Sequence, residues 1–330
     1  MTREPTDWTV EDLVRTRHTE GSRPGARRDP CRLALLIEGG SARSAYSSGM
    51  VVAIEELSLA TVFDAVYGVS GGALNGAWLL CGRAGQVMDT WWNREVMRSV
   101  IAPRRALRGR PVVDTDYLVN TVYVDLVPMD FAAILANPVS FHPIATDTAT
   151  GESVDLAPMV QDEDSLKLTL RASTRMPVLA GPPVALGERR FIDGGVAEMV
   201  PIRTALAHGA THVVALRTRR PDEFLDPPGN VQFHLVRRYL QRHAPGAITA
   251  WHNRYAAAQD EERVLATHPG VRQIRPPAHG PTVPGTSRGA RRLQSTVELG
   301  RESAHSTLTG WLGDSGPVRS TSAPGGGLSA

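Results

Sequence analysis

The sequence predicts an α/β fold with a central, mostly parallel sheet between layers of helices. Apolar strand-like runs alternate with helix-like segments along most of the 330 residues, and this alternation is typical of parallel sheets. The run at residues 33–37 is apolar throughout, as expected for a strand that is covered on both faces. These two observations together favour three layers, α/β/α.

The first part of the chain contains the clearest elements. The helix after the first strand is predicted by apolar residues near helical spacing, among them Ala45, Met50 and Ile54. Glycine-rich turns separate these strands from the helices that follow them. We expect the following order: strand 33–37, turn 38–40, helix 42–57, strand 62–67, turn 68–72 and helix 73–81.

The later elements continue the alternation. Residues 85–135 should be mainly helical, interrupted by a loop at 102–111 whose arginine and glycine content makes it a candidate lid. The strand 212–216 should close the sheet. Beyond residue 135 we expect strand 139–146, turn 150–151, helix 165–173, strands 184–186 and 190–192, helix 202–208, strand 212–216, and long helices over 233–266 and 288–312.

Composition excludes several classes of protein. The chain is 42% hydrophobic and 21% charged, close to globular averages, so collagen-like, coiled-coil and wholly disordered structures are excluded. With 36 Lys and Arg against 34 Asp and Glu, the net charge is only +2, which gives no support to nucleic-acid binding. Two cysteines, Cys31 and Cys81, are too few for a disulfide framework and should be buried thiols.

The chain is expected to form one domain at residues 31–314, including the C-terminal helices. Residues 1–30 are polar and should be a flexible arm, with at most a short helix near 10–17, and residues 315–330 are rich in Gly, Ser and Pro and should be disordered. No signal-peptide segment and no run of 18 apolar residues is found. We therefore expect a cytoplasmic protein.

The sharpest motif is the G-x-S-x-G pattern from Gly68 to Gly72, with Ser70 at its centre. It lies between a predicted strand and a predicted helix. A serine on such a sharp turn is forced outward as a nucleophile, and the flanking glycines relieve the crowding. The turn also places the serine oxygen at the positive end of a helix dipole. The alternative is a Gly/Ser turn that only caps the helix.

Two further glycine turns follow predicted strands. The first turn contains Gly39, Gly40 and Ser41, with Arg43 shortly after. It matches neither common nucleotide-binding pattern. The backbone N–H groups of this turn are therefore candidates for an oxyanion hole. At the second, Asp193 ends an apolar strand before Gly194-Gly195 and can accept a serine proton. Read alone, each can also be a structural turn.

Taken together, these segments resemble the patatin-like phospholipase and acyl-hydrolase family. The likeness covers roughly residues 31–217, and the first glycine turn is most similar to the bacterial branch of small patatin-like esterases. Besides the three turns, it rests on residues 63–75 around the serine, Ala145-Thr146-Asp147, Thr150-Gly151, Ala172-Ser173, Met176-Pro177, Pro201 and Gly209-Ala210.

The resemblance implies a serine acyl hydrolase that acts through an acyl-enzyme. Ser70 would be the nucleophile and Asp193 the base, while Gly39, Gly40 and Ser41 with Arg43 would form the oxyanion hole. The substrate would be a lipid or another acyl ester, and no metal or cofactor would be needed. Peripheral membrane contact is a separate expectation, which depends on the arginines between Arg98 and Arg110. Acyl length, headgroup, oligomeric state and physiological role are not encoded in these motifs.

The sequence departs from the family pattern at two positions. Ser41 and Ser44 stand where the family has glycine. Serine is strained at position 41 if a positive φ is needed there, and it crowds position 44 if another backbone approaches closely. A second hypothesis is therefore a weak or inactive lipid-binding or regulatory protein of the same fold.

Three other features have weaker functional interpretations. A Ser–His–Asp triad is compatible with the chain order, and its candidate histidines are His208, His212, His234 and His243. Five arginines between Arg98 and Arg110 suit anionic lipid headgroups, although a solvated loop explains them too. Trp91-Trp92 can line an acyl pocket or the core. The sequence has no pair of His or Cys residues at the spacing of metal ligands, so it gives little support to a metal site.

Overall fold

The computed structural model describes residues 4–223 and 229–313 and confirms the mixed α/β fold with a mostly parallel sheet. In the described part, one eight-stranded sheet has the order β5-β6-β3-β2-β1-β7-β8, with β4 pairing on β3. The neighbours from β3 to β8 run parallel, whereas β4, β5 and β6 join antiparallel. The strands are β1 Leu33–Ile37, β2 Ala65–Val69, β3 Ser140–Asp147, β4 Ser153–Asp155, β5 Val184–Leu186, β6 Arg189–Asp193, β7 His212–Leu216 and β8 Val271–Ile274.

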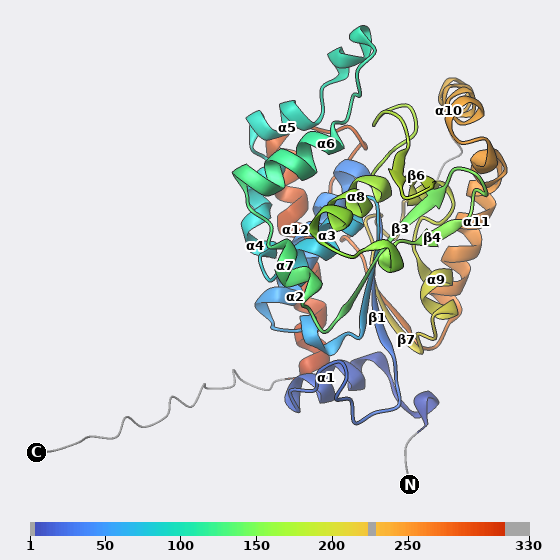
Figure 1. Cartoon of the computed structure of the whole chain (residues 1–330). Helices are drawn as coiled ribbons and strands as arrows, with labels where there is room; N and C mark the ends of the chain where they lie inside the picture. Colours follow the sequence, from blue (N-terminus) through green and yellow to red (C-terminus); the bar gives the residue numbers. More distant parts are fainter. Residues whose placement is uncertain (1–3, 224–228, 314–330) are drawn as a thin grey trace, which may run out of the picture.

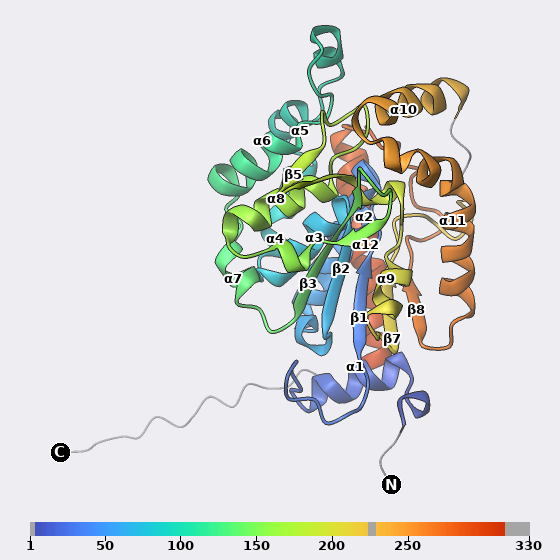
Figure 2. The same cartoon turned by 45° about the vertical axis from the view of Figure 1, so that its right-hand side comes forward.

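Helices cover both faces of this sheet, which makes three layers (Figures 1 and 2). The α-helices are α1 Val10–Thr19, α2 Ser44–Glu56, α3 Gly71–Leu80, α4 Ala84–Val87, α5 Arg94–Val100, α6 Thr115–Tyr117, α7 Phe131–Leu135, α8 Glu163–Ser173, α9 Ile202–Ala207, α10 Asn230–His243, α11 Ile248–Thr267 and α12 Ala290–Leu312. A π-helix, Leu118–Leu126, follows α6. No helix in the described ranges has the length and apolar character needed to cross a bilayer.

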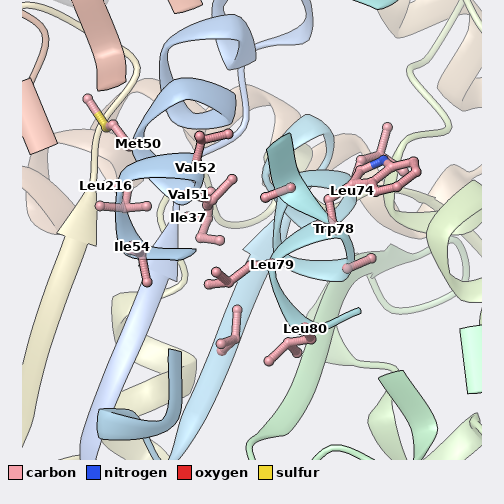
Figure 3. Close-up of a cluster of buried hydrophobic side chains, with 14 of the residues drawn as sticks. Ile37, Met50, Val51, Val52, Ile54, Leu74, Trp78, Leu79, Leu80 and Leu216 are labelled. Atoms are coloured by element: carbon pink, nitrogen blue, oxygen red, sulfur yellow. The ribbon is translucent and has the colours of Figure 1, made fainter. Parts of the chain in front are cut away.

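Alternate residues of β1 point to opposite faces of the sheet. Leu35 and Ile37 pack with α2, α3 and α12 in the larger core cluster, part of which Figure 3 shows. Leu36 points the other way and packs with residues of α9 and α11, such as Ile202 and Leu265. This burial on both faces explains why the strand is apolar throughout.

Glycines let α2 and α12 cross in direct backbone contact. A Cβ atom on Gly49 would lie 1.9 Å from the carbonyl oxygen of Val297, and one on Gly300 would lie 2.1 Å from that of Tyr46. Any larger residue would therefore push the helices apart. The crossing holds α2 firmly, and the first residues of α2 border the candidate site.

Several predicted boundaries are wrong by a few residues or more. β2 begins at Ala65 rather than at residue 62, because Asp64 ends the preceding turn and its carboxylate accepts hydrogen bonds from Arg17, Arg27 and the Leu33 N–H. The helix predicted over 233–266 is two helices, since Pro245 cannot continue the hydrogen-bond ladder. β4 and β8 were not predicted. Because β8 pairs with β7, β7 is not an edge strand of the sheet as predicted.

The N-terminal segment contains a helix, α1, at the place where a short helix near 10–17 was expected, and this helix packs on the core through Val10, Leu13 and Val14. Thr9 caps α1 by accepting a hydrogen bond from the Asp12 N–H at 3.1 Å. The Arg17 guanidinium is buried and pairs with Asp29 at 2.7 Å and Asp64 at 2.8 Å. These polar partners make a polar sequence fold against the core. The predicted disordered tail, 315–330, lies outside the described residues.

The candidate lid is a short arm at residues 101–113. Its base is an antiparallel bridge between Ile101 and Val113, and its tip is a 3₁₀ helix at Pro103–Arg108. The arm extends away from the body at the end of the molecule opposite α1 (Figure 1). Cys31 and Cys81 are free and buried, as predicted.

Candidate active site

Ser70 lies on a sharp turn between β2 and α3. Its φ of +55° and ψ of −126° are strained for a serine. The turn needs both flanking glycines: a Cβ on Gly68 would lie 2.5 Å from the Ala73 Cα, and one on Gly72 would lie 2.2 Å from the carbonyl oxygen of Ile37. The G-x-S-x-G pattern is therefore explained by backbone packing, and Ser70 is not a simple helix cap, because its side chain makes no capping hydrogen bond.

Strand register brings Asp193 beside Ser70. Val69 pairs with Ile144 on β3, and the next residue, Ala145, pairs with Asp193 on β6. As a result the Ser70 Oγ donates to the Asp193 Oδ2 at 2.7 Å, and each residue is only 6% exposed. The two residues are 123 apart in sequence, so only the sheet brings them together.

The Asp193 carboxylate is held by its neighbours. Its Oδ1 accepts from the Gly195 N–H at 2.9 Å, and the Thr146 Oγ1 donates to its carbonyl oxygen at 2.9 Å. A Cβ on Gly194 would meet the Ile144 carbonyl oxygen at 2.5 Å. Burial raises the pKa of Asp193 above its ordinary value, although Ser70, Gly195 and Arg254 favour the charged form. A raised pKa makes the carboxylate a better proton acceptor.

The glycine turn after β1 borders Ser70. A Cβ on Gly39 would be 2.7 Å from the Val69 carbonyl oxygen and 3.0 Å from the Ser70 Cβ. Within the described part of the chain, the N–H groups of Gly39 and Gly40 donate to no acceptor, whereas the Ala42 N–H donates to the Gly285 carbonyl. Free N–H groups beside a nucleophile are the geometry of an oxyanion hole.

Each serine that departs from the family pattern has a local compensation. Ser41 has a φ of +53°, so this position does need the left-handed region, and its Oγ donates to the Gly285 carbonyl at 2.6 Å. Ser44 is fully buried against the nucleophile turn, where a Cβ on Gly71 would lie 2.3 Å from its Oγ. The hydroxymethyl group of Ser44 therefore fits only because residue 71 is glycine.

Three arginines reach the cavity in front of Ser70, which has a volume of about 460 Å³. Arg43 is bordered by Gly40, and its Nε has no hydrogen-bond partner among the described residues. The Arg254 Nε donates to the Gly195 carbonyl at 2.7 Å, and Arg219 comes from the chain after β7. Burial lowers the pKa of both Arg43 and Arg254, and the charge of Arg219 lowers it further.

Glu38 anchors this cationic group. It is fully buried and accepts hydrogen bonds from Arg217 at 2.9 Å, Arg219 at 2.5 Å and the Thr218 N–H at 2.8 Å. Burial alone would raise its pKa, but Arg217 and Arg219 hold the pKa of Glu38 down at about 2. Arg217 also pairs with Glu262. Among the described residues neither Arg43 nor Arg254 makes a salt bridge, although more distant carboxylates, Glu38 for Arg43 and Asp193 for Arg254, favour their charged forms.

A second, apolar pocket of about 90 Å³ opens on the other side of Ser70. It is lined by side chains such as Leu74, Trp91, Val100 and Met176. Trp92 is not in this lining. The two pockets share Ser41, Ser70 and Met176. A molecule bound at Ser70 would therefore contact the arginine-lined cavity on one side and the apolar pocket on the other.

The histidines expected for a triad are elsewhere. Among the described residues, no histidine lines either pocket at Ser70. His212 bonds to the Trp8 carbonyl at 2.9 Å, and His208 lies next to Tyr67 and Asp155. His234 and His243 make aromatic contacts with Phe233 and Tyr239. The geometry therefore offers Asp193 as the proton acceptor for Ser70.

Fold and site together define the class: an α/β protein whose serine stands on a strand-to-helix elbow beside a buried aspartate. A family model described as patatin-like phospholipase matches residues 35–206, more than half of the chain. The chain belongs to the patatin-like phospholipase family.

Two known proteins are similar in sequence to parts of this chain, with less than 30% identity. The uncharacterized protein YjjU of Escherichia coli (strain K12) is 29% identical over 195 residues, 57% of this chain and 52% of the relative. An intracellular phospholipase A2 of Caenorhabditis elegans is 26% identical over 231 residues, 66% of this chain and 21% of the relative. The chain thus spans about half the length of the first relative and a fifth of the second.

Two solved structures are similar. Human GIVD cytosolic phospholipase A2 gives a TM-score of 0.43 at 9% identity, over 92% of this chain and 62% of that one. VipD from Legionella pneumophila gives a TM-score of 0.38 at 14% identity, over 84% of this chain and 67% of that one.

Sequence reasoning missed Glu38 as an anchor and Arg219 and Arg254 as cavity residues. It placed Ser173 only within a family-like segment, with no role assigned; the Ser173 Oγ accepts from the Ser70 N–H at 3.0 Å and donates to the Ile144 carbonyl at 2.6 Å. A signal existed for Arg219, because it follows a parallel strand at the edge where β1 and β2 also end. Arg254 lies in the middle of α11 and has no such signal.

Proposed function

We propose that this chain is a serine acyl hydrolase that works through a Ser70–Asp193 dyad. The observation that carries the proposal is the 2.7 Å hydrogen bond between the Ser70 Oγ and the Asp193 Oδ2 in a buried setting. The proposed domain is residues 31–314, which α1 extends by packing on α12.

The proposed reaction has two halves. The Ser70 Oγ attacks the acyl carbonyl while Asp193 takes its proton. The N–H groups of Gly39 and Gly40, with the Ser41 backbone and the Arg43 charge, stabilise the oxyanion. Protonated Asp193 then gives its proton to the leaving alcohol, which leaves an acyl group on Ser70. Water, deprotonated by Asp193, releases the acid and restores Ser70. None of these steps uses a metal or a cofactor.

The two pockets support an ester with an apolar acyl chain and an anionic alcohol part. The apolar pocket at Leu74 and Trp91 suits the chain. The cavity is lined by Arg43, Arg219 and Arg254. Arg219 is paired with Glu38, and a phosphate or carboxylate in the cavity would relieve the cost of burying the guanidinium groups of Arg43 and Arg254. This is the chemistry of a phospholipid or lysophospholipid.

We propose that the arm at 101–113 contacts membranes peripherally from the cytoplasmic side. Leu107 at its tip is 88% exposed, and Arg104, Arg105, Arg108 and Arg110 surround it. α10, across the cavity, exposes Val231 and Leu235. Exposed apolar side chains among arginines suit an anionic lipid surface. Free thiols at Cys31 and Cys81 support a reducing compartment.

Membrane contact is tested with Leu107→Ser and with anionic and neutral vesicles. We expect the substitution to weaken sedimentation with anionic vesicles but to leave hydrolysis of a water-soluble short-chain ester unchanged. Leu312→Ser, on the opposite side of the molecule, is the control. Equal sedimentation of all three proteins would rule out the arm as the contact.

The dyad is tested with a fluorophosphonate probe and peptide mass spectrometry. We expect an adduct on Ser70 in the wild type, none on the peptide in Ser70→Ala, and labelling slowed by a factor of about 100 or more in Asp193→Asn, since a positioned base contributes this much. Ser295→Ala in α12 is the serine control. Full labelling or turnover in folded Ser70→Ala would refute the assignment.

A second candidate function is a lipid-binding protein with little activity, and the strained φ of Ser41 favours it. Ser41→Gly and Ser44→Gly discriminate between the two. If these substitutions create ester hydrolysis that the parent lacks, the binding function is favoured. If the parent already hydrolyses esters and the variants do not exceed it, the dyad enzyme is supported.

A further inference from the structure

Three potential metal ligands meet away from Ser70, on the face of the sheet that α9 covers. They are His142 on β3, Asp155 on β4, and His208 directly after α9. One ligand atom from each lies within 4.8 Å of the other two. The residues span 66 positions of sequence, so no local spacing signals the cluster. We propose that His142, Asp155 and His208 form a binding site for a divalent transition-metal ion of the zinc type.

The distances are close to those that an ion would impose. The His142 Nδ1 is 2.7 Å from the Asp155 Oδ2, and the His208 Nδ1 is 4.0 Å from the same oxygen. Ligand atoms on a tetrahedral zinc ion are roughly 3.3 Å apart, given bonds of about 2.0–2.1 Å. Side-chain movements of less than about 1 Å would therefore bring both of these pairs to the distance that zinc needs.

Neighbouring groups orient two of the three ligands from behind. The His142 Nε2 is 2.9 Å from the Ser140 Oγ, and the Tyr67 ring stacks on the His142 ring at 4.3 Å. The Asp155 Oδ1 accepts from the Ala157 N–H at 2.9 Å, which leaves Oδ2 for the cluster. A histidine whose second nitrogen is hydrogen-bonded, and a carboxylate that is held through its other oxygen, are the usual supports of metal ligands.

The donor set selects the class of ion. Two imidazoles and one carboxylate suit zinc and its neighbours in the first transition row, whereas calcium and magnesium prefer oxygen ligands alone. The His142 and Asp155 side chains are 12% exposed and that of His208 is 37% exposed, so an ion can enter from the His208 side and keep a water ligand.

The ion would join elements that also support Asp193. β3 carries His142 and, four residues on, Thr146, whose hydroxyl donates to the Asp193 carbonyl. α9 comes shortly after the Asp193 turn and leads directly to His208. Metal binding would thus tie the β3–β4 hairpin to the end of α9 and stiffen the frame on one side of the dyad. The proposal does not depend on the proposed hydrolase activity.

The test is zinc binding by the untagged, EDTA-treated full chain, measured by competition with a chromophoric chelator. We expect one bound Zn²⁺ per chain and at least a tenfold weaker affinity in Asp155→Asn and His208→Gln. His305→Gln, on the exposed face of α12, is the matched control and should bind as the wild type does. Zinc should also raise the melting temperature of the wild type and the control only.

Co²⁺ gives an independent readout, since N and O ligation produces visible absorption bands that the two variants should lose. Circular dichroism without metal establishes that each variant is folded. No zinc binding by the wild type at about 100 µM free ion, or equal binding by folded Asp155→Asn, would overturn the proposal and leave a histidine–aspartate hydrogen bond. Variant loss with control retention would establish the site.

Discussion

Replacing Glu38 by Gln should destabilise the fold strongly, because this carboxylate is the buried partner of Arg217 and Arg219. Its pKa falls from 4.5 to about 2 on folding, which corresponds to about 3 kcal/mol of unfolding free energy at neutral pH. Loss of one member of a buried ion pair costs a similar 3–5 kcal/mol or so. We therefore expect Glu38→Gln to lower the unfolding free energy by about 3 kcal/mol at pH 7.

The pH dependence of this loss follows from the sign of the shift. Because the folded pKa of Glu38 is depressed, its ionisation stabilises the fold fully above the unfolded pKa of 4.5, and this contribution is lost as pH falls through about 2. The difference between wild type and Glu38→Gln should thus be largest at pH 6–7 or so and smaller by about 2 kcal/mol near pH 3.

The assay is urea unfolding followed by circular dichroism, at several pH values from neutral to acid. Glu298→Gln, an exposed acid on α12, is the control and should change the unfolding free energy by less than about 0.5 kcal/mol. A difference for Glu38→Gln that stays constant down to pH 3, or one no larger than that of the control, would refute the electrostatic explanation of this network.

Three further predictions use other features of the fold. Gly300→Ala should lower the urea midpoint strongly, because its Cβ would overlap the Tyr46 carbonyl. The control is Gly310→Ala on the same helix, whose Cβ meets nothing within 4 Å and which should be neutral or stabilising by up to about 1 kcal/mol. Equal midpoints for the two variants would contradict the close crossing of α2 and α12. Val178 has a φ of +70°, so Val178→Gly should raise the unfolding free energy by up to about 1 kcal/mol, and a lower value would show that its side-chain contacts outweigh the strain. Because the pKa of Asp193 is raised, its ionised form destabilises the fold at neutral pH, and this effect disappears in acid. Asp193→Asn should therefore raise the urea midpoint at pH 7 but not near pH 3. A lower urea midpoint for the variant at pH 7 would argue against the raised pKa.

The sequence was most informative where backbone packing dictates residue type. The turn from Gly68 to Gly72 could be predicted because only glycine fits beside Ala73 and Ile37. Asp193 became a candidate base because it ends an apolar strand before two glycines. Partners that depend on tertiary approach could not be predicted. Arg254 lies within a helix that gives no sign of its facing Asp193.

The same reason explains the errors in the fold. The helix near 10–17 was expected, but its packing on the core was not, because Arg17 is charged and yet its side chain is buried between Asp29 and Asp64. β4 and β8 are short, and their inner residues are only half-buried, so neither gives the apolar run that identifies a parallel strand.

The packing of α1 on α12 has a practical consequence for handling the protein. The Arg15 Nε donates to the Trp311 carbonyl at 2.9 Å, so α1 and the end of α12 meet at the end of the molecule opposite the arm (Figure 1). A fluorescent protein joined before Pro5, or a surface linker attached after Leu312, would therefore be anchored far from the cavity at Ser70. Either attachment would leave the arm and the cavity uncovered.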